Sequence, residues 1–479
     1  MSRISRRSLL AAGALGAAAD AIPFSSWIKQ QAWAQGTRVR HNAYSSQGKA
    51  MLVKYRDAVA RMMNTSVTPE RSPLSWTFQW YTHWCGPGKA SELNRIYPNP
   101  SPERTLANDM WNTCQAHGPG EREDFFLPWH RMFVYYFEEI IREKSSDPSF
   151  TLPYWNYSNA AQGAIPPEFA VTSSPLYRAN RNPGVNTGAK IPPSYVTLGA
   201  LTQQTYSANG ANQGFCATLD FGIHGNVHVW VGDSTNMGSV PWAARDPIFW
   251  MHHCNIDRLW ASWNRGNCKN PTQDSSWMDK QFVFADIHGT KVVATVKDFD
   301  DIAKLHYTYA EFEPASCRPT IRAVNPALLA ALTSQTQVAR TPLHLNLARP
   351  AAPAAGARTL TDQIRSLDDK SVYLVLQDVQ AEAAPGVVYD VYLGLPQGAS
   401  PSPESPNYVG TINFFGVTMT GPDMSGMMPR TFSLDVTDKI KALQASGALN
   451  ETPAVTLVPQ GEPAENARAS IGQVQLVTQ

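Results

Sequence analysis

Two neighbouring apolar segments decide the fold: Gly222-Ile-His-Gly-Asn-Val-His-Val-Trp230 and Asp246-Pro-Ile-Phe-Trp-Met-His-His-Cys-Asn-Ile-Asp-Arg-Leu-Trp260. In the first segment His224 and His228 are four residues apart, so on a helix their rings project from one face about one turn apart. Two imidazoles at that spacing can bind one metal ion. A histidine pair in the second segment can supply a third ligand.

That pair is His252 and His253, and Asp257 lies one helical turn beyond His253. We expect the Asp257 carboxylate to accept the spare ring N–H of a metal-bound His253. An isolated His-x-x-x-His pattern is more often found without a metal. Here the rings lie among tryptophan and phenylalanine residues, where an unpaired imidazole would be costly. The surroundings therefore favour a metal site.

A second group of histidines lies upstream in equally aromatic sequence: His83, His117 and His130. Imidazole ligands suit copper, zinc, iron and nickel, whereas thiolate-rich sets suit structural zinc. The chain has no His-Glu-x-x-His pattern of a zinc peptidase and no carboxylate-rich pattern of a di-iron bundle. Two adjacent three-histidine groups are typical of a dinuclear copper pair that binds dioxygen.

The motifs around these histidines resemble the tyrosinase and polyphenol oxidase family of type-3 copper proteins, particularly its three-part plant members. The segments that carry the resemblance, besides the two quoted above, are Cys114-Gln-Ala-His117-Gly118, Phe125-Phe-Leu-Pro-Trp-His-Arg131 and Leu152-Pro-Tyr-Trp-Asn-Tyr157. The resemblance implies a mainly α fold. A dicopper four-helix-bundle core with long loops would be followed by a small C-terminal antiparallel β-sandwich.

The resemblance also implies a ligand set for two copper ions. One copper would bind three upstream histidines and the other three downstream ones: His83, His117, His130, His224, His228 and His253. His252 and Asp257 would not bind copper and would hold the ligand side chains in place. The chain departs from the family by having a longer interval between His117 and His130, and the extra residues Gly118 to Arg122 can loop out.

Four further positions match residues that act on the substrate in the family. An acidic residue four before the first histidine of the second copper holds a water there, and an Asn just after that histidine helps to polarise it. These positions hold Asp220 and Gly225, so the helper amide is missing. Val240 matches the gate residue, often a bulky Phe in plant catechol oxidases. Phe249 lies one turn before His253.

The implied activity is a copper-dependent oxidation of o-diphenols to o-quinones with O2 as co-substrate. Oxidation of monophenols is left open, because Gly225 supplies no amide. One alternative is an o-aminophenol oxidase on the same site. Another is a non-catalytic O2-binding or copper-binding protein, which the methionine cluster Met419, Met424, Met427 and Met428 favours, since thioethers bind Cu(I).

The chain of 479 residues suggests two or three domains. We expect an export signal in 1–34, a dicopper catalytic domain in 35–265 and a middle segment in 266–345 that wraps the bundle. A flexible linker would follow in 346–360, rich in Pro, Ala and Gly, and a covering β-sandwich in 361–479. Helical periodicity runs from Gln47 to about Asn64, and alternation predicts strands at 372–376, 387–393 and 454–458.

The charge balance and the N-terminal sequence indicate which partners to expect. Forty basic residues against thirty-nine acidic ones give no argument for nucleic acid, and the family resemblance implies small phenolic substrates. The twin-arginine pair Arg6-Arg7, the apolar run Leu9 to Ala19 and the small residues Ala32 and Ala34 predict twin-arginine export to the periplasm or exterior. The apolar run is too short to span a bilayer, so no membrane insertion of the mature chain is expected.

The cysteines leave alternatives open. An exported chain permits disulfides among the six cysteines, whose connectivity cannot be deduced from spacing. In the family one cysteine often forms a thioether with the second histidine of the first copper. Cys85 and Cys114 are both candidates for such a bond with His117, and an ordinary disulfide is the alternative.

The C-terminal part contains an apolar loop from Phe414 to Met428. Apolar clusters of this kind often mark a contact surface. One hypothesis is that the loop plugs the copper cavity and restrains the enzyme. The other is that Phe414 and Phe415 merely pack the sandwich core.

Overall fold

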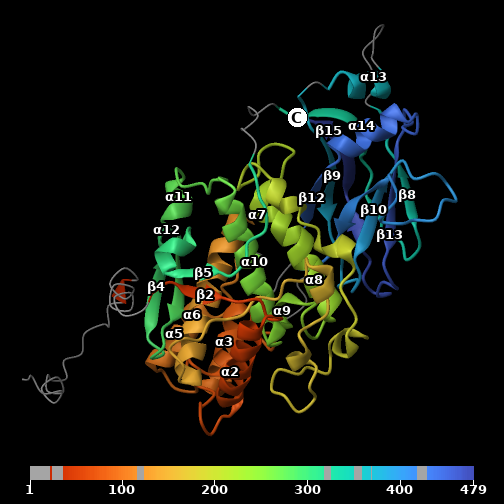
Figure 1. Cartoon of the computed structure of the whole chain (residues 1–479). Helices are drawn as coiled ribbons and strands as arrows, with labels where there is room; N and C mark the ends of the chain where they lie inside the picture. Colours follow the sequence, from red (N-terminus) through yellow and green to blue (C-terminus); the bar gives the residue numbers. More distant parts are fainter. Residues whose placement is uncertain are drawn as a thin grey trace, which may run out of the picture.

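The computed structural model describes residues 22–23, 36–115, 123–317, 325–349, 359–367, 369–417 and 429–479 of the chain. The predicted export signal, His117 and the four methionines of the cluster lie outside these residues, apart from the pair 22–23. Figure 1 shows two units, a helical body and a β-sandwich above it. Among the described residues, no helix is both long and apolar enough to cross a bilayer.

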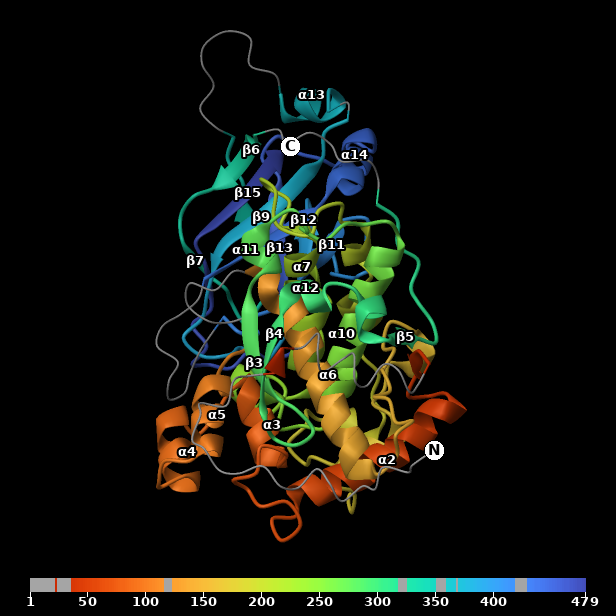
Figure 2. The same ribbon diagram turned by 90° about the vertical axis from the view of Figure 1, so that its left-hand side faces the viewer.

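The helical body is built around four helical segments, each of which buries at least one face. They are α2 (Ser46–Met63), α3 (Trp76–His83), α6 (Phe126–Ser145) and α10 (Ile248–Arg265). Figure 2 shows α6 and α10 side by side. Both are buried almost all round, and Phe137 of α6 stacks on Trp250 of α10 with ring centroids 3.4 Å apart. The outer helices α4 (Lys89–Ile96) and α5 (Pro102–Met110) cover one end.

A kinked run of helix crosses the top of the body, under the sandwich. It comprises α7 (Gly214–Leu219), the π-helical turn η7 (Asp220–His224) and α8 (Gly225–Val231), and the short helix α9 (Val240–Ala243) follows. The kink falls at Gly222, whose backbone angles of φ −88° and ψ −109° are not helical. Glycine tolerates such angles, and a π-turn re-aims the side chains around it.

The middle segment wraps the body with short elements. These are α11 (Ser275–Met278), β3 (Gln281–Ala285), β4 (Lys291–Thr295), α12 (Val296–Phe299), the 3-10 turn η8 (Ile302–Leu305) and β5 (Tyr307–Tyr309). Strand β4 pairs with β3 and also with β1 (Ile22–Pro23), and β5 runs parallel to β2 (Arg38–Arg40). A disulfide between Cys268 and Cys317 closes the segment.

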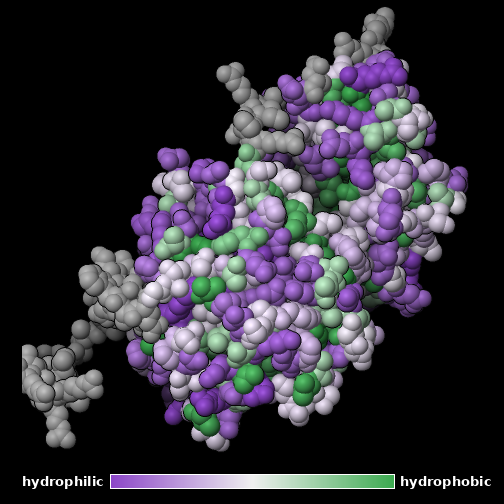
Figure 3. Space-filling model, viewed as in Figure 1, coloured by the Kyte–Doolittle hydropathy of each residue, from purple (hydrophilic) through white to green (hydrophobic). Residues whose placement is uncertain are grey.

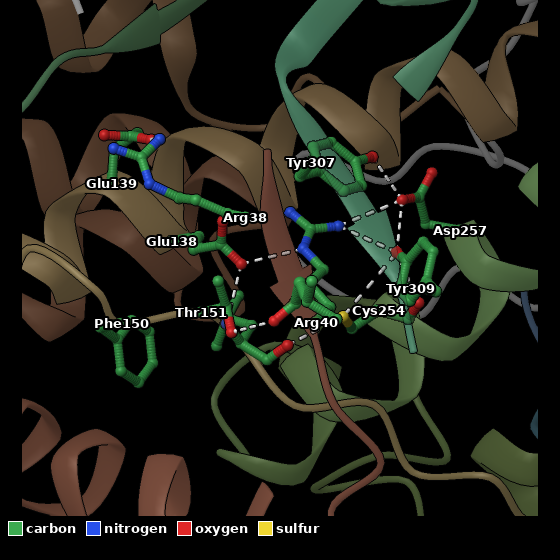
Figure 4. A network of polar contacts seen from close by, with 12 residues as sticks. Arg38, Arg40, Glu138, Glu139, Phe150, Thr151, Cys254, Asp257, Tyr307 and Tyr309 are labelled. Carbon is green, nitrogen blue, oxygen red and sulfur yellow. Dashed lines mark hydrogen bonds and ion pairs between the residues drawn. The ribbon is translucent and has the colours of Figure 1, made fainter. Parts of the chain in front are cut away.

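A buried polar network ties these strands to the bundle (Figure 4). Arg40 of β2 donates to Glu138 of α6 at 2.9 Å and to Asp257 of α10 at 3.1 Å. Tyr307 and Tyr309 of β5 donate to the same Asp257 oxygen, each at 2.5 Å. Because every one of these groups is buried, the network fixes the register of the two helices through the strands.

The sandwich consists of two four-stranded antiparallel sheets, ordered β11-β10-β13-β8 and β12-β9-β15-β6. The strands are β6 (Ala327–Leu332), β8 (Leu343–Asn346), β9 (Val372–Val379), β10 (Tyr389–Leu393), β11 (Tyr408–Ile412), β12 (Arg430–Asp435), β13 (Ala454–Pro459) and β15 (Gln473–Thr478). The minor pair β7 (Thr336–Gln337) and β14 (Ser470–Ile471) lies beside them, with helices α13 (Leu360–Arg365) and α14 (Thr437–Ala445) at one end.

The predicted boundary between middle segment and sandwich is wrong. Strand β6 pairs with β15 and β8 with β13, so the sheets already include Ala327. The segment 346–360, predicted as the linker between the two units, joins β8 to α13 and is a connection within the sandwich. The connection from the middle segment to the sandwich instead lies between β5 and β6. Proline and alanine content predicts a loop, but it does not indicate which elements the loop connects.

The two units exchange apolar side chains. Phe415 of the sandwich belongs to the core of the helical body, whereas Ala217 and Phe221 of the kinked run belong to the sandwich core. The large hydrophobic residues exposed in the described chain are scattered: Val53, Val67, Val171 and Leu328. The face in Figure 3 is accordingly a mixture of hydrophilic and hydrophobic residues. Buried apolar side chains from both units therefore meet at the seam.

Candidate metal centre

Two groups of buried histidines meet between α3, α6, α8 and α10. His224, His228, His252 and His253 offer ring nitrogens within 4.8 Å of one another, and His83, Cys114 and His130 form a second such group. The rings of His130 and His253 stack with centroids 4.4 Å apart, so the groups adjoin. Every predicted ligand in the described residues lies here. His117 lies outside the described residues.

Hydrogen bonds fix the tautomer of four rings. The Nδ1 atoms of His83, His130 and His228 bond to the carbonyl oxygens of Val240 (3.1 Å), Phe126 (2.8 Å) and Met237 (2.7 Å), respectively. A carbonyl oxygen only accepts, so each Nδ1 carries the proton and each Nε2 keeps its lone pair. His224 Nδ1 likewise bonds to Asp220 Oδ1 at 2.8 Å. Imidazoles held in this way are prepared to bind metal through Nε2.

The rings are also held neutral. Burial is the main cause that lowers the pKa of His83 to about 3, and the neighbouring His224 lowers it further. Burial and adjacent histidines likewise hold the pKa values of His130, His228 and His253 well below the usual range. A buried, neutral imidazole keeps one lone pair, which needs either a hydrogen-bond donor or a metal ion. The Nε2 atoms of His228 and His253 face each other at 3.4 Å.

Two residues were expected to support the metal ligands, Asp257 and His252. Asp257 was predicted to accept the spare N–H of His253. This is wrong, because Arg40, Arg131 and the two β5 tyrosines occupy its carboxylate, and His253 Nδ1 has no partner among the described residues. His252 is a wholly buried member of the downstream histidine group, and its Nδ1 bonds with the hydroxyl of Tyr157 at 3.0 Å.

The four predicted substrate-site residues surround the histidines. Phe249 lies with its ring 4.0 Å from that of His253 and 5.0 Å from that of His83. Val240 is buried at the start of α9, where its carbonyl oxygen binds His83. Asp220 is engaged by His224. Gly225 begins α8, and the space where its side chain would stand holds the amide of Asn413.

Two contacts were not expected from the motifs. Cys114 Sγ lies 3.6 Å from His130 Nε2, which puts this thiol within the first histidine group. Phe415 stacks on His228, with ring centroids 4.1 Å apart and an interplanar angle of 10°, and its centroid is 5.6 Å from that of His224. Phe414 packs in the sandwich core instead. Phe415 therefore lies against the histidines, as the first hypothesis for the loop expects, and Phe414 packs in the sandwich core, as the second expects.

Comparison with known proteins gives a consistent picture along the chain. The common central domain of tyrosinase matches residues 73–197 and 186–266, the polyphenol oxidase middle domain matches 272–320, and a domain of unknown function matches 325–479. A tyrosinase of Hahella sp. (strain CCB-MM4) is 29% identical over 92% of this chain and 99% of its own length. The latent polyphenol oxidase of Prunus armeniaca is 27% identical over 85% of this chain and 70% of its own length.

Solved structures share the fold. Latent apple tyrosinase superposes with a TM-score of 0.64 at 21% identity, covering 93% of this chain and 97% of its own. Fold, histidine groups and relatives together define a copper oxidoreductase that uses O2. The chain belongs to the tyrosinase and polyphenol oxidase family and carries the plant-type middle domain.

The cofactor of this family is a dinuclear copper centre, and the described residues fit it. The donors are neutral imidazoles, which suit copper better than hard cations such as magnesium. The buried Nε2 atom of His224 has no hydrogen-bond partner within the described residues, which is unfavourable unless a ligand uses its lone pair. The chain is thus a copper polyphenol oxidase with a mainly α catalytic body and a C-terminal sandwich.

Proposed function

We propose that this enzyme oxidises o-diphenols to o-quinones far faster than it hydroxylates monophenols. Six histidines would hold the two copper ions: His83, His117, His130, His224, His228 and His253. When bound, the copper pair supplies O2 binding and removes two electrons from the diphenol, so that two catechols and one O2 give two quinones and two waters. The observation that carries the assignment is the pair of adjoining buried histidine groups.

The chain's own residues would orient these rings and exclude water. The carbonyl oxygens of Val240, Phe126 and Met237 hold three Nδ1 protons, and Asp220 holds the fourth. Phe249 packs between His83 and His253 and keeps both rings from rotating. Val240 would serve as a small gate residue that admits substituted phenols.

Weak monophenol turnover follows from the groups around His224. A monophenol must lose its proton before it binds copper. Asp220 is the nearest carboxylate, but its Oδ1 accepts from His224 Nδ1. Gly225 contributes no amide to help it. An o-diphenol is more acidic and chelating, so it depends less on such a base.

One oxygen-uptake experiment tests this function. Copper-loaded protein is given a catechol, the matching monophenol and an o-aminophenol at equal concentration. We expect the catechol rate to exceed the monophenol rate by at least tenfold. A faster o-aminophenol rate would favour the alternative enzyme, and no uptake with any substrate would favour a binding protein. His228→Ala should abolish uptake, whereas replacement of the exposed His288 should not.

We also propose export through the twin-arginine machinery to the periplasm or exterior. The Arg6-Arg7 pair and the small residues near Ala34 support it. Such export carries folded proteins, which suits an enzyme that acquires its metal beforehand. Replacing both arginines with lysine should leave the enzyme inside the cell, as measured by fractionation. Unchanged export of that variant would contradict the proposal.

A further inference from the structure

Gly225 sits directly beside a side chain of the sandwich. A Cβ atom added at Gly225 would lie 2.6 Å from Oδ1 and 2.8 Å from Nδ2 of Asn413, closer than carbon approaches such atoms. Asn413 follows strand β11 and is wholly buried. The missing side chain therefore leaves a hollow next to His224, and the Asn413 amide fills it.

The amide is bound on several sides. Its Nδ2 donates to the carbonyl oxygen of Phe221 at 2.6 Å and to Asn226 Oδ1 at 2.9 Å. Its Oδ1 accepts from the backbone N–H of Phe415 at 3.1 Å. Asn226 in turn donates to Thr411 of β11 at 2.9 Å. Because these groups are buried, the amide cannot move away from an added Cβ without leaving polar atoms unpaired.

These bonds connect the turn that carries His224 to the residue that covers His228. Phe221 and Asn226 flank His224, and Phe415 is two residues after Asn413. The bond from Phe415 N–H to Asn413 Oδ1 fixes the backbone from which the Phe415 ring reaches His228. On the other side of the turn, the Phe221 ring points into the sandwich, 5.7 Å from that of Phe432.

We propose that Asn413 is the positioning residue that seats Phe415 over His228, and that residue 225 must be glycine to admit it. This rests on the proposed function, because covering His228 restrains an enzyme only if His228 binds copper. It also gives Gly225 a second meaning. The position that carries a helper amide in the family is occupied here by an amide from the sandwich, so a larger residue at 225 acts first by unseating the covering unit.

The test is a double-mutant cycle in the full-length, copper-loaded protein with Gly225→Ala, Asn413→Ala and both together. A protease site introduced between residues 318 and 324 allows the sandwich to be released by one cut. Two quantities are measured: catechol oxidation before the cut relative to after it, and the rate at which the fragments separate on size exclusion after the cut. Asn407→Ala is the matched control, because this buried asparagine bonds to Leu393 within the sandwich.

We expect each single variant to raise oxidation before the cut several-fold and to speed separation. Gly225→Ala should add little when Asn413 is already alanine, because the clash is then absent. Equal effects of Gly225→Ala in both backgrounds would overturn the proposal, as would unchanged separation in Asn413→Ala. Circular dichroism and copper content check that the variants fold. If released wild-type protein fails to oxidise catechol, the proposed function fails, but the separation rates still decide the role of Asn413.

Discussion

At the scale of single residues, the hydrogen bonds of the imidazole rings matter more than their spacing. His252 and His253 are adjacent and both fully buried. His253 stacks on His130 and lies against Phe249, so it faces both histidine groups. His252 belongs to the downstream group alone, and its Nδ1 bonds to the hydroxyl of Tyr157. We therefore propose that His253 is the copper ligand of this pair.

Replacing each of these histidines with alanine separates the two roles. His253→Ala should lose at least one of the two copper ions and all catechol oxidation, as measured by metal analysis and oxygen uptake. His252→Ala should keep both ions and lose roughly 10- to 100-fold in activity, the usual cost of removing a supporting contact. The reverse pattern, with copper lost only from His252→Ala, would refute the assignment.

Asp390 predicts a pH dependence of stability. It is buried in β10, where, among the described residues, only Oδ2 accepts hydrogen bonds, from Gln460 (2.9 Å) and Tyr392 (3.4 Å). Burial raises the pKa of this carboxyl to about 6, well above that of an unfolded aspartate near 3.9. Between these values the folded state binds the extra proton, so this residue's contribution to stability improves as pH falls from 7 towards 4.

Asp390→Asn should remove that dependence. The asparagine oxygen can still accept from Gln460, and no charge is buried at neutral pH. We expect the variant to gain on the order of 1–3 kcal/mol at pH 7 and little at pH 4.5, measured by denaturant unfolding at both values. Asp435→Asn, at an exposed position of β12, is the control. Equal gains at both pH values would mean that the carboxyl does not titrate as described.

Residue identity predicted which histidines gather at the candidate site better than it predicted the groups that hold their rings. The four-residue spacing of His224 and His228 places both rings on one helix face. Spacing also suggested a bond between His253 and Asp257, and here it failed. Asp257 lies one turn away along α10, but two parallel strands from distant parts of the chain bring Arg40 and Tyr309 to it. Pairing between β2 and β5 cannot be read from local sequence.

At the scale of elements, the network around Arg40 holds the bundle to its wrapping. Arg40→Met should destabilise the protein by about 3–5 kcal/mol, because it leaves Glu138 and Asp257 buried without this cation. Thermal or denaturant unfolding measures the loss. Arg56→Met, on the exposed face of α2, removes a cation without that consequence and should change stability by less than about 0.5 kcal/mol. Similar losses in both variants would contradict a special role for Arg40.

Periodic elements were predictable and irregular ones were not. The 3.6-residue pattern predicted α2 to within one residue at each end, and alternation predicted the central strands β9, β10 and β13. Strands β6 and β8 were missed as part of the sandwich, because a proline- and alanine-rich stretch follows them. The π-turn at η7 was also missed. Its kink falls at Gly222, next to Phe221, which packs against the sandwich, and neither feature shows in the apolar pattern of the sequence.

At the scale of the whole molecule, the sandwich is expected to restrain the enzyme through Phe415. Phe415→Ala should raise catechol oxidation by the uncut protein several-fold without changing copper content, because the ring over His228 is removed. Phe414→Ala is the matched control, since it opens a cavity in the sandwich core and should instead lower stability by about 3–5 kcal/mol. Equal oxidation by wild type and Phe415→Ala would show that the ring does not limit access.

If release of the sandwich activates the enzyme, the exchange of side chains across the seam should limit how long the activated enzyme lasts. Phe221 lies on the same turn as His224, and the sandwich shields it. When the sandwich dissociates, Phe221 becomes exposed to water. The π-turn that positions His224 then loses the contacts that the sandwich made with it. We expect released enzyme to show a burst of oxidation followed by decay through self-association, with a half-life that shortens as protein concentration rises. The sandwich would then determine the lifetime of the active enzyme as well as the moment of its activation.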